Sequence, residues 1–224
     1  MAPTTQTRKY RKLNNKQSYL IHLVRRLDCD VLGAVETRQQ YDLLPNMMKM
    51  ERQLDLREGA RCQTSHNVHE RFGINQQGVT CLVVNEMMGG FVTEQGVDEE
   101  GLGRWSWIKF TGKTVITRIV VAYMPCSTRK QAVHATMAQH RRYWRLQGKK
   151  TCPRKLMRLA LIGKLKEWRG LGEKLILLID SNENMEGGPL ARMLADPDLD
   201  MVDAVKVRSH SPGPPNFCKR KPSD

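Results

Sequence analysis

The chain has 224 residues, of which 40% are hydrophobic and 27% are charged, and its formal net charge is +14 at pH 7. This composition is ordinary for a globular domain with a sizeable core, and it excludes a chain that is disordered throughout. The excess of positive charge favours a polyanionic partner, nucleic acid or an anionic surface, with a merely solubilising basic surface as the alternative.

No apolar run in the sequence is long enough to span a bilayer, and the polar N-terminus lacks the apolar core of a signal peptide. We therefore expect an intracellular protein that does not act in a membrane, with the nucleus as a candidate compartment. The six cysteines and six histidines are scattered without metal-binding spacing, which argues against a zinc site and against a disulfide framework. No histidine is assigned a catalytic role.

The N-terminal part of the chain predicts an arm, a helix and a strand. Residues 1–16 are polar and basic and indicate a flexible arm, and residues 17–224 are expected to form a single domain. Apolar residues at helical spacing predict a helix over 18–27, and the aliphatic run Val31–Val35 predicts a strand. Glu36 follows that strand directly, so its carboxylate is placed at a strand end.

A second amphipathic helix is predicted over 41–56, and short alternating runs with Gly and Asn between them predict antiparallel hairpins from 59 to 119. Trp105, Trp107 and Phe110 are predicted to bury one face of a strand, and stacking of one aromatic ring on a base is the alternative.

Two helices are predicted after Tyr123, a residue that ends the next strand before Pro125 stops its ladder. The first runs to Trp144, capped by Ser127 or Thr128. The inward-facing residues are predicted to be Val133, Met137, His140 and Trp144 in the first helix and Leu159, Ile162, Leu165 and Trp168 in the second, over 155–168. The outer faces are predicted to be basic, and the residues expected there are Arg141, Arg142, Arg145, Lys149, Lys150, Arg154, Lys155 and Arg158. The residues predicted to bind nucleic acid are Arg141, Arg142, Lys149 and Lys150. A solvated basic surface is the alternative.

The stretch 174–184, KLILLIDSNEN, predicts a buried strand with polar groups at its C-terminal tip. If the extended backbone continues, Asp180 and Asn182 point to one side. A strand followed by an Asp/Asn turn is the simpler interpretation. The same arrangement at Glu36 and Tyr123, each at the end of another strand, favours a shared site. Asp203 is expected to cap or brace a loop.

Seven short sequence segments occur along the chain in this order: DVLGAVET, QGVTCLVVN, GLGRWSWIKF, TRIVVAYMP, LILLIDSNEN, LDMVDAV and PGPPNFCKR. As an ordered set they resemble the endonuclease/exonuclease/phosphatase superfamily, and within it the endonuclease domains of retrotransposon-type (LINE-like) elements. The resemblance implies an α/β fold, an α+β sandwich of two mixed β-sheets packed face to face with flanking helices. It also implies Mg²⁺- or Mn²⁺-dependent phosphodiester hydrolysis of nucleic acid, with DNA as the first candidate.

The resemblance also implies roles for the residues at the strand ends. Glu36 matches the glutamate that binds the divalent metal. Tyr123 matches the active-site tyrosine, whose hydroxyl contacts the scissile phosphate or its metal-bound network. Asp180 would orient or deprotonate the attacking water, and Asn182 would hydrogen-bond the water or the phosphate.

Two segments of the family pattern have no counterpart in the sequence. They are a first strand that carries an asparagine and a closing Ser-Asp-His segment, and Asn14 and Asn15 stand in the basic arm rather than after an apolar strand. We therefore expect a domain that lacks strands at both ends and has little or no nuclease activity. Two other functions remain open, a non-catalytic nucleic-acid-binding remnant of a retroelement and a phosphatase of small phosphorylated molecules or lipids. The oligomeric state is not predicted.

Overall fold

The computed structural model describes residues 26–27, 29–38, 43, 59–70, 76–127 and 132–210. The predicted arm, most of the helices predicted over 18–27 and 41–56, and the PGPPNFCKR segment lie outside these residues. Within the described ranges, no helix combines the length and the apolar character that crossing a membrane requires.

The smaller sheet consists of β1 (Val31–Val35), β2 (Arg61–Ser65) and β3 (Thr80–Val84) in the order β1-β3-β2. Both neighbours of the central strand β3 run antiparallel to it. The prediction of two mixed sheets is therefore wrong for this sheet, which is wholly antiparallel in the described part of the chain. Strand β1 has the bounds that its aliphatic run predicted.

The larger sheet has the order β4-β5-β6-β7 and is mixed. Its strands are β4 (Val92–Val97), β5 (Trp105–Thr111), β6 (Ile116–Tyr123) and β7 (Lys174–Asp180). The first three form antiparallel hairpins, as the alternating runs predicted, while β6 and β7 are parallel. A parallel pair needs a long crossover, and the two central helices of the chain supply it.

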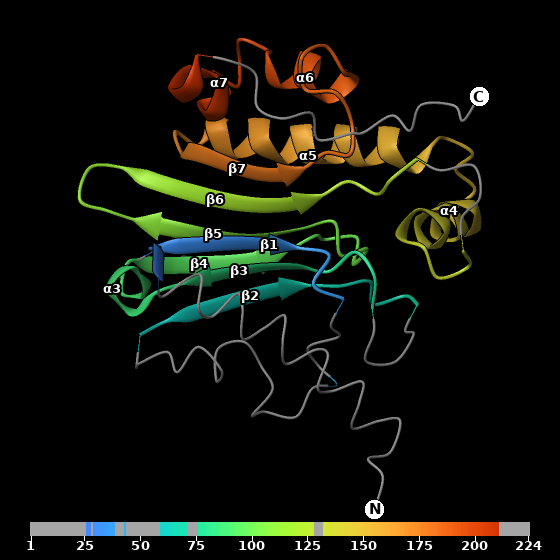
Figure 1. Ribbon diagram of the computed structural model, residues 1–224, viewed down its shortest axis with the longest axis horizontal. Helices are drawn as coiled ribbons and strands as arrows, with labels where there is room; N and C mark the ends of the chain where they lie inside the picture. The colour runs from blue at the N-terminus through green and yellow to red at the C-terminus, as the bar shows by residue number, and fades with distance from the viewer. Residues whose placement is uncertain are drawn as a thin grey trace, which may run out of the picture.

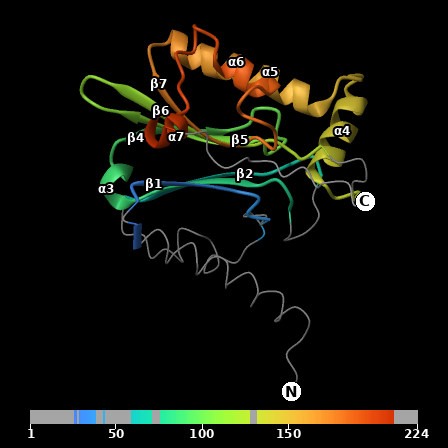
Figure 2. The same cartoon turned by 45° about the horizontal axis from the view of Figure 1, so that its top comes forward.

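The two sheets pack face to face, as Figures 1 and 2 show. A cluster of buried residues from both sheets fills the space between them: Leu82, Val84, Ile108, Phe110, Ile119 and Val121. Gly33 of β1 allows one of the closest approaches, since a Cβ atom there would lie 2.7 Å from Cδ1 of Leu178. The predicted sandwich of sheets with flanking helices is confirmed.

Helices cover the outer face of the larger sheet (Figure 2). The longest is α5 (Pro153–Gly170), accompanied by α6 (Pro189–Leu194) and α7 (Ala204–Ser209). A second core lies between α5 and the sheet, and its buried members include Trp105, Val120, Met157, Leu161 and Leu165. Two further helices of the described residues lie at opposite ends of the sheets, α3 (Glu86–Gly89) at one end and α4 (Thr136–Leu146) at the other. Asp203 caps α7 by accepting hydrogen bonds from two backbone amides, as expected.

Strand β5 is buried on both faces rather than one. Trp105 and Trp107 belong to the core under α5, whereas Phe110 belongs to the core between the sheets. Side chains alternate along a strand, so positions 105 and 107 share a face and position 110 has the other. The prediction that these aromatic residues pack in the core is confirmed, and the prediction that they bury a single face is wrong.

The predicted helix bounds and faces also need correction. Helix α4 begins at Thr136 after Ala135, so neither Ser127 nor Thr128 is its cap. Val133 precedes the helix and is 65% exposed. In α5, Leu159 is 52% exposed, because the buried stripe passes through other positions of the helix. The buried residues of α5 are Pro153, Arg154, Met157, Leu161, Ile162, Leu165 and Trp168.

Candidate active site

Three strand ends meet at one end of the molecule. Strands β1, β6 and β7 all run toward the end at which α4 lies (Figure 1). Tyr123 and Asp180 are register partners at the ends of the parallel pair, and the Met124 amide donates to the Asp180 carbonyl at 2.9 Å. Glu36 follows β1 on the facing sheet. The structure therefore brings together the predicted residues Glu36, Tyr123, Asp180 and Asn182, and we call them the strand-end site.

The Tyr123 side chain links the two sheets. Its hydroxyl donates a hydrogen bond to Oε1 of Glu36. Tyr123 is only 3% exposed, whereas Glu36 is exposed. Burial raises the pKa of the Tyr123 hydroxyl, and the hydrogen bond to the Glu36 carboxylate raises that pKa further. Tyr123 therefore keeps its proton at neutral pH and acts as a hydrogen-bond donor.

Asp180 and Asn182 are held together by a turn. Strand β7 ends at Asp180, and Asn182 has a φ of 46°, in the left-handed region that asparagine tolerates better than most residues. The extended backbone on which their shared direction was predicted does not continue. Instead, the Asn182 amide donates to Oδ1 of Asp180 at 3.3 Å, and Nδ2 of Asn182 donates to the Met124 carbonyl at 2.9 Å.

The two carboxylates of the site influence each other. Burial raises the pKa of Asp180, and the negative charge of Glu36 raises it further, against the opposing effect of the Asn182 amide. In the described part of the chain, neither Glu36 nor Asp180 forms a salt bridge. Glu36 also has a positive φ of 51°, an uncommon conformation for this residue. The charge of Arg154 acts on Asp180 from nearby and lowers its pKa, but no cation of the described residues forms a salt bridge with either carboxylate.

Cys126 is a neighbour of the site that the sequence did not single out. Its thiol donates to Oδ1 of Asn182 at 2.8 Å. Desolvation raises the pKa of the Cys126 thiol, and the charges of Glu36 and Asp180 add to the effect, so all three groups lie close together. The signal in the sequence was its position directly after Pro125, at the end of β6.

Arg154 braces the loops that carry the site. Its side chain is nearly buried, and Nη1 donates to the Pro125 carbonyl at 2.6 Å. Nη2 donates to the carbonyls of Ser181 and Asn182 at 3.2 and 3.1 Å and to Oε2 of Glu183 at 2.9 Å. One guanidinium group therefore joins the loop after β6 to the loop after β7.

The sequence carries a signal for the buried position of Arg154. This residue precedes Met157 and Leu161 by three and seven positions, so it lies on the same helix face as these buried residues. Arg158, one turn further along, donates to Glu183 at 3.0 Å. The prediction that these two arginines belong to an outer basic surface is wrong.

No protein-family model matches the sequence, and no curated protein matches it either. Solved structures do match. The chain aligns with the human Nocturnin catalytic domain with bound sulfate anion at a TM-score of 0.57 and 13% identity, covering 86% of this chain and 66% of that one. It aligns with truncated TDP2 from Caenorhabditis elegans at a TM-score of 0.50 and 16% identity, covering 79% of this chain and 58% of that one. Both alignments leave a third or more of the matched chain uncovered.

The fold is the one seen in these two structures, and it agrees with the fold that the resemblance to the endonuclease/exonuclease/phosphatase superfamily implies. At these identities the likeness concerns the fold alone. In this fold, the strand-end site occupies one end of the sandwich of sheets, where residues distant in sequence come together.

The four residues predicted to bind nucleic acid divide into two groups. Arg141, Lys149 and Lys150 line one hollow, together with Arg145. We call this set of four the basic hollow. Arg142 lies apart from it, because its guanidinium pairs with both carboxylate oxygens of Glu70 and donates to the Val133 carbonyl at 2.8 Å. The structure therefore does not support the prediction that the guanidinium of Arg142 is free to bind a phosphate.

The strand-end site has the donors that a hard divalent cation requires. Glu36 and Asp180 offer carboxylate oxygens, and their mutual repulsion would be relieved by a cation. Among the described residues, no three His, Cys, Asp or Glu side chains form a cluster that could hold a metal alone. Mg²⁺ needs only one or two carboxylates, because it retains water and takes oxygens from a substrate phosphate. The residues present fit Mg²⁺ or Mn²⁺.

Proposed function

We propose that the chain hydrolyses phosphodiester bonds of nucleic acid, with Mg²⁺ or Mn²⁺ held at the strand-end site by Glu36 with Asp180 beside it. The observation that carries this proposal is the meeting of two carboxylates that have no salt-bridge partner in the described residues. The net charge of +14 supports a polyanionic substrate, and DNA is the first candidate. An origin in a retrotransposon-type element is part of the proposal and rests on the order of the sequence motifs.

Each residue of the site has a role that its environment suits. Asp180 orients the attacking water and accepts its proton, because a raised pKa makes a carboxylate a stronger base. Tyr123 is a protonated donor next to Glu36 and donates to a phosphate oxygen. Asn182 is held by Met124 and Cys126 and uses its second amide hydrogen toward the water or the phosphate. A bound Mg²⁺ would neutralise charge on the phosphate and on the leaving oxygen.

The test is nicking of supercoiled plasmid with and without Mg²⁺. The two missing family segments predict little or no activity, but Glu36, Tyr123, Asp180 and Asn182 lie together at one site, so we expect the wild type to nick and to do so only with Mg²⁺. We expect Asp180→Asn and Glu36→Gln to lose this activity. Glu186→Gln is the matched control, since it removes an exposed carboxylate from the loop after β7. Equal nicking by wild type and Asp180→Asn would refute the proposal, as would the absence of nicking by the wild type.

A second function is favoured by the basic hollow, which consists of residues distinct from the strand-end site. A non-catalytic nucleic-acid-binding protein would use the hollow and need no metal. In that case the wild type binds DNA in EDTA, and addition of Mg²⁺ produces no nicks. Hydrolysis of p-nitrophenyl phosphate without nicking would instead favour a phosphatase of small molecules.

A further inference from the structure

The basic hollow lies where the chain reverses between α4 and α5. It has a volume of about 600 Å³ and is lined by Arg141, Arg145, Gly148, Lys149, Lys150, Thr151, Cys152 and Pro153. Gly148 makes the reversal possible, since its φ of 71° is strained for residues with a side chain. The Lys149 amide then donates to the Trp144 carbonyl at 2.8 Å. Two lysines are thereby returned to the helix face that carries two arginines.

The hollow is partly preorganised. Arg141 and Arg145 are one turn apart on α4 and share a helix face. Nζ of Lys149 lies 4.4 Å from the centroid of the Trp144 ring, and Trp144 is buried. This cation–π contact holds one ammonium group at the rim of the hollow without neutralising it. Less side-chain entropy would then be lost when an anion binds.

The cations of the hollow differ from most others on the same two helices. Arg142 pairs with Glu70, Arg158 with Glu183, and Arg169 with Asp200. Lys164 and Lys166 also pair with carboxylates. In the described part of the chain, none of the four residues of the hollow forms a salt bridge. Lys149 interacts electrostatically with Glu100, whose carboxylate already pairs with Arg104 at 2.6 Å.

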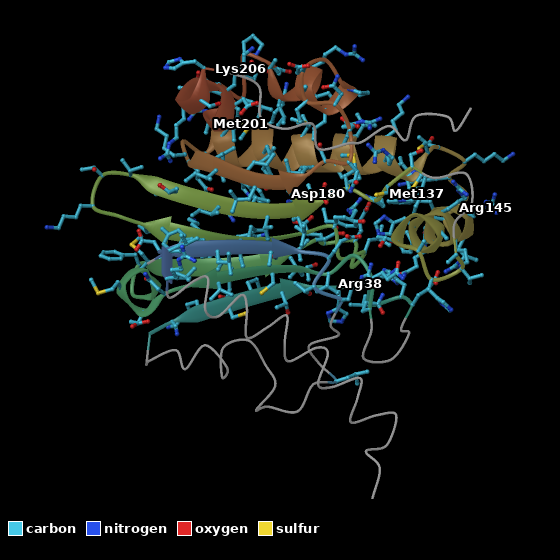
Figure 3. The ribbon with its side chains drawn as sticks, viewed as in Figure 1. Arg38, Met137, Arg145, Asp180, Met201 and Lys206 are labelled. Atoms are coloured by element: carbon cyan, nitrogen blue, oxygen red, sulfur yellow. The ribbon has the colours of Figure 1, made fainter. Side chains whose placement is uncertain are left out.

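The hollow adjoins the strand-end site through the chain itself. Pro153 lines the hollow, and the next residue, Arg154, donates to the carbonyls of Pro125 and Ser181 beside the site. Consecutive Cα atoms are about 3.8 Å apart, so the backbone that lines the hollow continues directly into the residue that braces the loops of the strand-end site. Figure 3 shows Arg145 on α4, beyond the end of β7 at which Asp180 lies.

We propose that the basic hollow binds backbone phosphates of the substrate strand that flank the phosphate at the strand-end site. This inference rests on the proposed function and specifies its substrate as a polynucleotide strand rather than a mononucleotide. Concave, uncompensated positive charge concentrates polyanions, and arginine matches the geometry of phosphate oxygens. Contacts with phosphates that do not react bind ground state and transition state alike, so they lower KM and leave kcat unchanged.

The experiment compares two variants that each lose four positive charges. The hollow variant is Arg141→Gln/Arg145→Gln/Lys149→Gln/Lys150→Gln. The matched control is Lys113→Gln/Arg192→Gln/Lys206→Gln/Arg208→Gln, which removes exposed cations away from the hollow. Circular dichroism confirms that each is folded. Binding of a fluorescent 20-nucleotide single strand is measured by anisotropy in EDTA over a series of KCl concentrations, and cleavage of the same strand is measured with Mg²⁺.

If three or four phosphates are neutralised at the hollow, the slope of log K against log salt should become shallower by about 2 to 3 in the hollow variant. The control variant should keep the slope of the wild type to within about 1. In the cleavage assay the hollow variant should have a KM at least about tenfold higher with an unchanged kcat.

The outcomes separate this inference from the proposed function. A loss of binding confined to the hollow variant supports the inference even if the wild type never cleaves. Equal losses of affinity for the DNA strand in the hollow and control variants would show that only the net charge of the protein matters. This result would overturn the inference even if the wild type cleaves. Wild-type binding to vesicles with 30% phosphatidylserine, with no binding to the DNA strand, would also overturn it.

Discussion

Strands β6 and β7 run parallel, and their two ends are built in opposite ways. Where the strands begin, Arg118 of β6 donates to both carboxylate oxygens of Glu173 at 2.6 and 2.8 Å. The rings of Trp107 and Trp168 lie 4.1 and 4.4 Å from the guanidinium carbon. Both charges are buried, with side-chain exposures of 4% and 2%, and each neutralises the other.

Where the same strands end, Tyr123 and Asp180 stand beside Glu36, and the described residues provide no salt bridge to either carboxylate. A buried ion pair is costly to break, because the remaining charge is left without water or a partner. Carboxylates that repel each other at a partly open site are instead suited to bind an external cation. The comparison distinguishes an end that holds the sheet to its helices from an end that is available for chemistry.

We call the end of β6 and β7 at the strand-end site the open end and the end at Arg118 and Glu173 the closed end. The largest expected effect is on activity at the open end. Asp180→Asn should lower the Mg²⁺-dependent nicking rate by about 10² to 10⁴-fold, because it removes the proposed base. Its melting temperature at pH 7 should be no lower than that of the wild type, since the substitution removes a repulsion. Initial nicking rates and thermal melts measure the two effects. If the melting temperature of Asp180→Asn fell together with its activity, Asp180 would have a structural role like that of the Arg118–Glu173 pair.

The second effect is on stability at the closed end. Arg118→Met should reduce the free energy of unfolding by about 3 kcal/mol, because the buried Glu173 loses its two close hydrogen bonds and keeps only the salt bridge to Lys109, at 3.7 Å. Urea unfolding at pH 7 measures this change. The double variant Arg118→Met/Glu173→Leu is the control and should recover most of the loss, since an apolar pair replaces the ion pair. A loss below about 1 kcal/mol in the single variant would contradict the structural role of this pair.

An intermediate effect is expected at Arg154, which is buried like Arg118 but braces the open end. Arg154→Lys keeps the positive charge but loses the planar guanidinium group, whose N–H groups donate to both loops. The loops after β6 and β7 should therefore shift relative to each other. A misplacement of about 1 Å costs about 10²-fold in rate, so kcat should fall by that order with KM unchanged. Steady-state kinetics on an oligonucleotide tests this. A raised KM with unchanged kcat would make Arg154 a substrate-binding residue instead.

The smallest effect concerns pH. Because burial and then Glu36 raise the pKa of Asp180, the folded protein holds this proton more tightly than the unfolded chain does. The stability contributed by Asp180 is therefore present at acid pH and lost as the pH rises through its folded pKa. The free energy of unfolding of Asp180→Asn should be larger than that of the wild type at pH 7, and this difference should become smaller toward pH 4. Urea unfolding at several pH values measures the difference. A difference that grows toward pH 4 would show that folding lowers the pKa of Asp180 instead of raising it.

Much of the strand-end site could be predicted because its signals are local. The aliphatic runs at Val31–Val35 and Lys174–Asp180 each end in polar groups, and the structure places both strands at these positions. Tyr123 likewise ends β6 before Pro125. An apolar run that stops abruptly indicates a strand and the position of its tip. The prediction that the strand at 174–180 is buried is wrong, because β7 is the last strand of its sheet in the described residues and its Ile176 and Leu178 are 46% and 38% exposed.

The faces and partners of individual side chains could not be predicted in the same way. The side chain of Phe110 lies on the opposite face of β5 from that of Trp105, and Arg142 pairs with Glu70, which is far away in sequence. Asn182 reached Asp180 through a left-handed turn that no hydrophobic pattern marks. Each outcome depends on which surface lies next to the residue after packing.

By itself, the sequence determined the positions of the strands and the acidic and polar groups at their ends, because hydrophobic periodicity is a property of neighbouring residues. Only the tertiary structure decided which charges are matched. Arg118, Arg142 and Arg154 are all arginines in basic or amphipathic stretches, yet they meet Glu173, Glu70 and the loop carbonyls beside Asp180. The carboxylates of Glu36 and Asp180 meet each other instead. Electrostatic interactions depend on distance in space, and folding alone brings together groups that are distant along the chain.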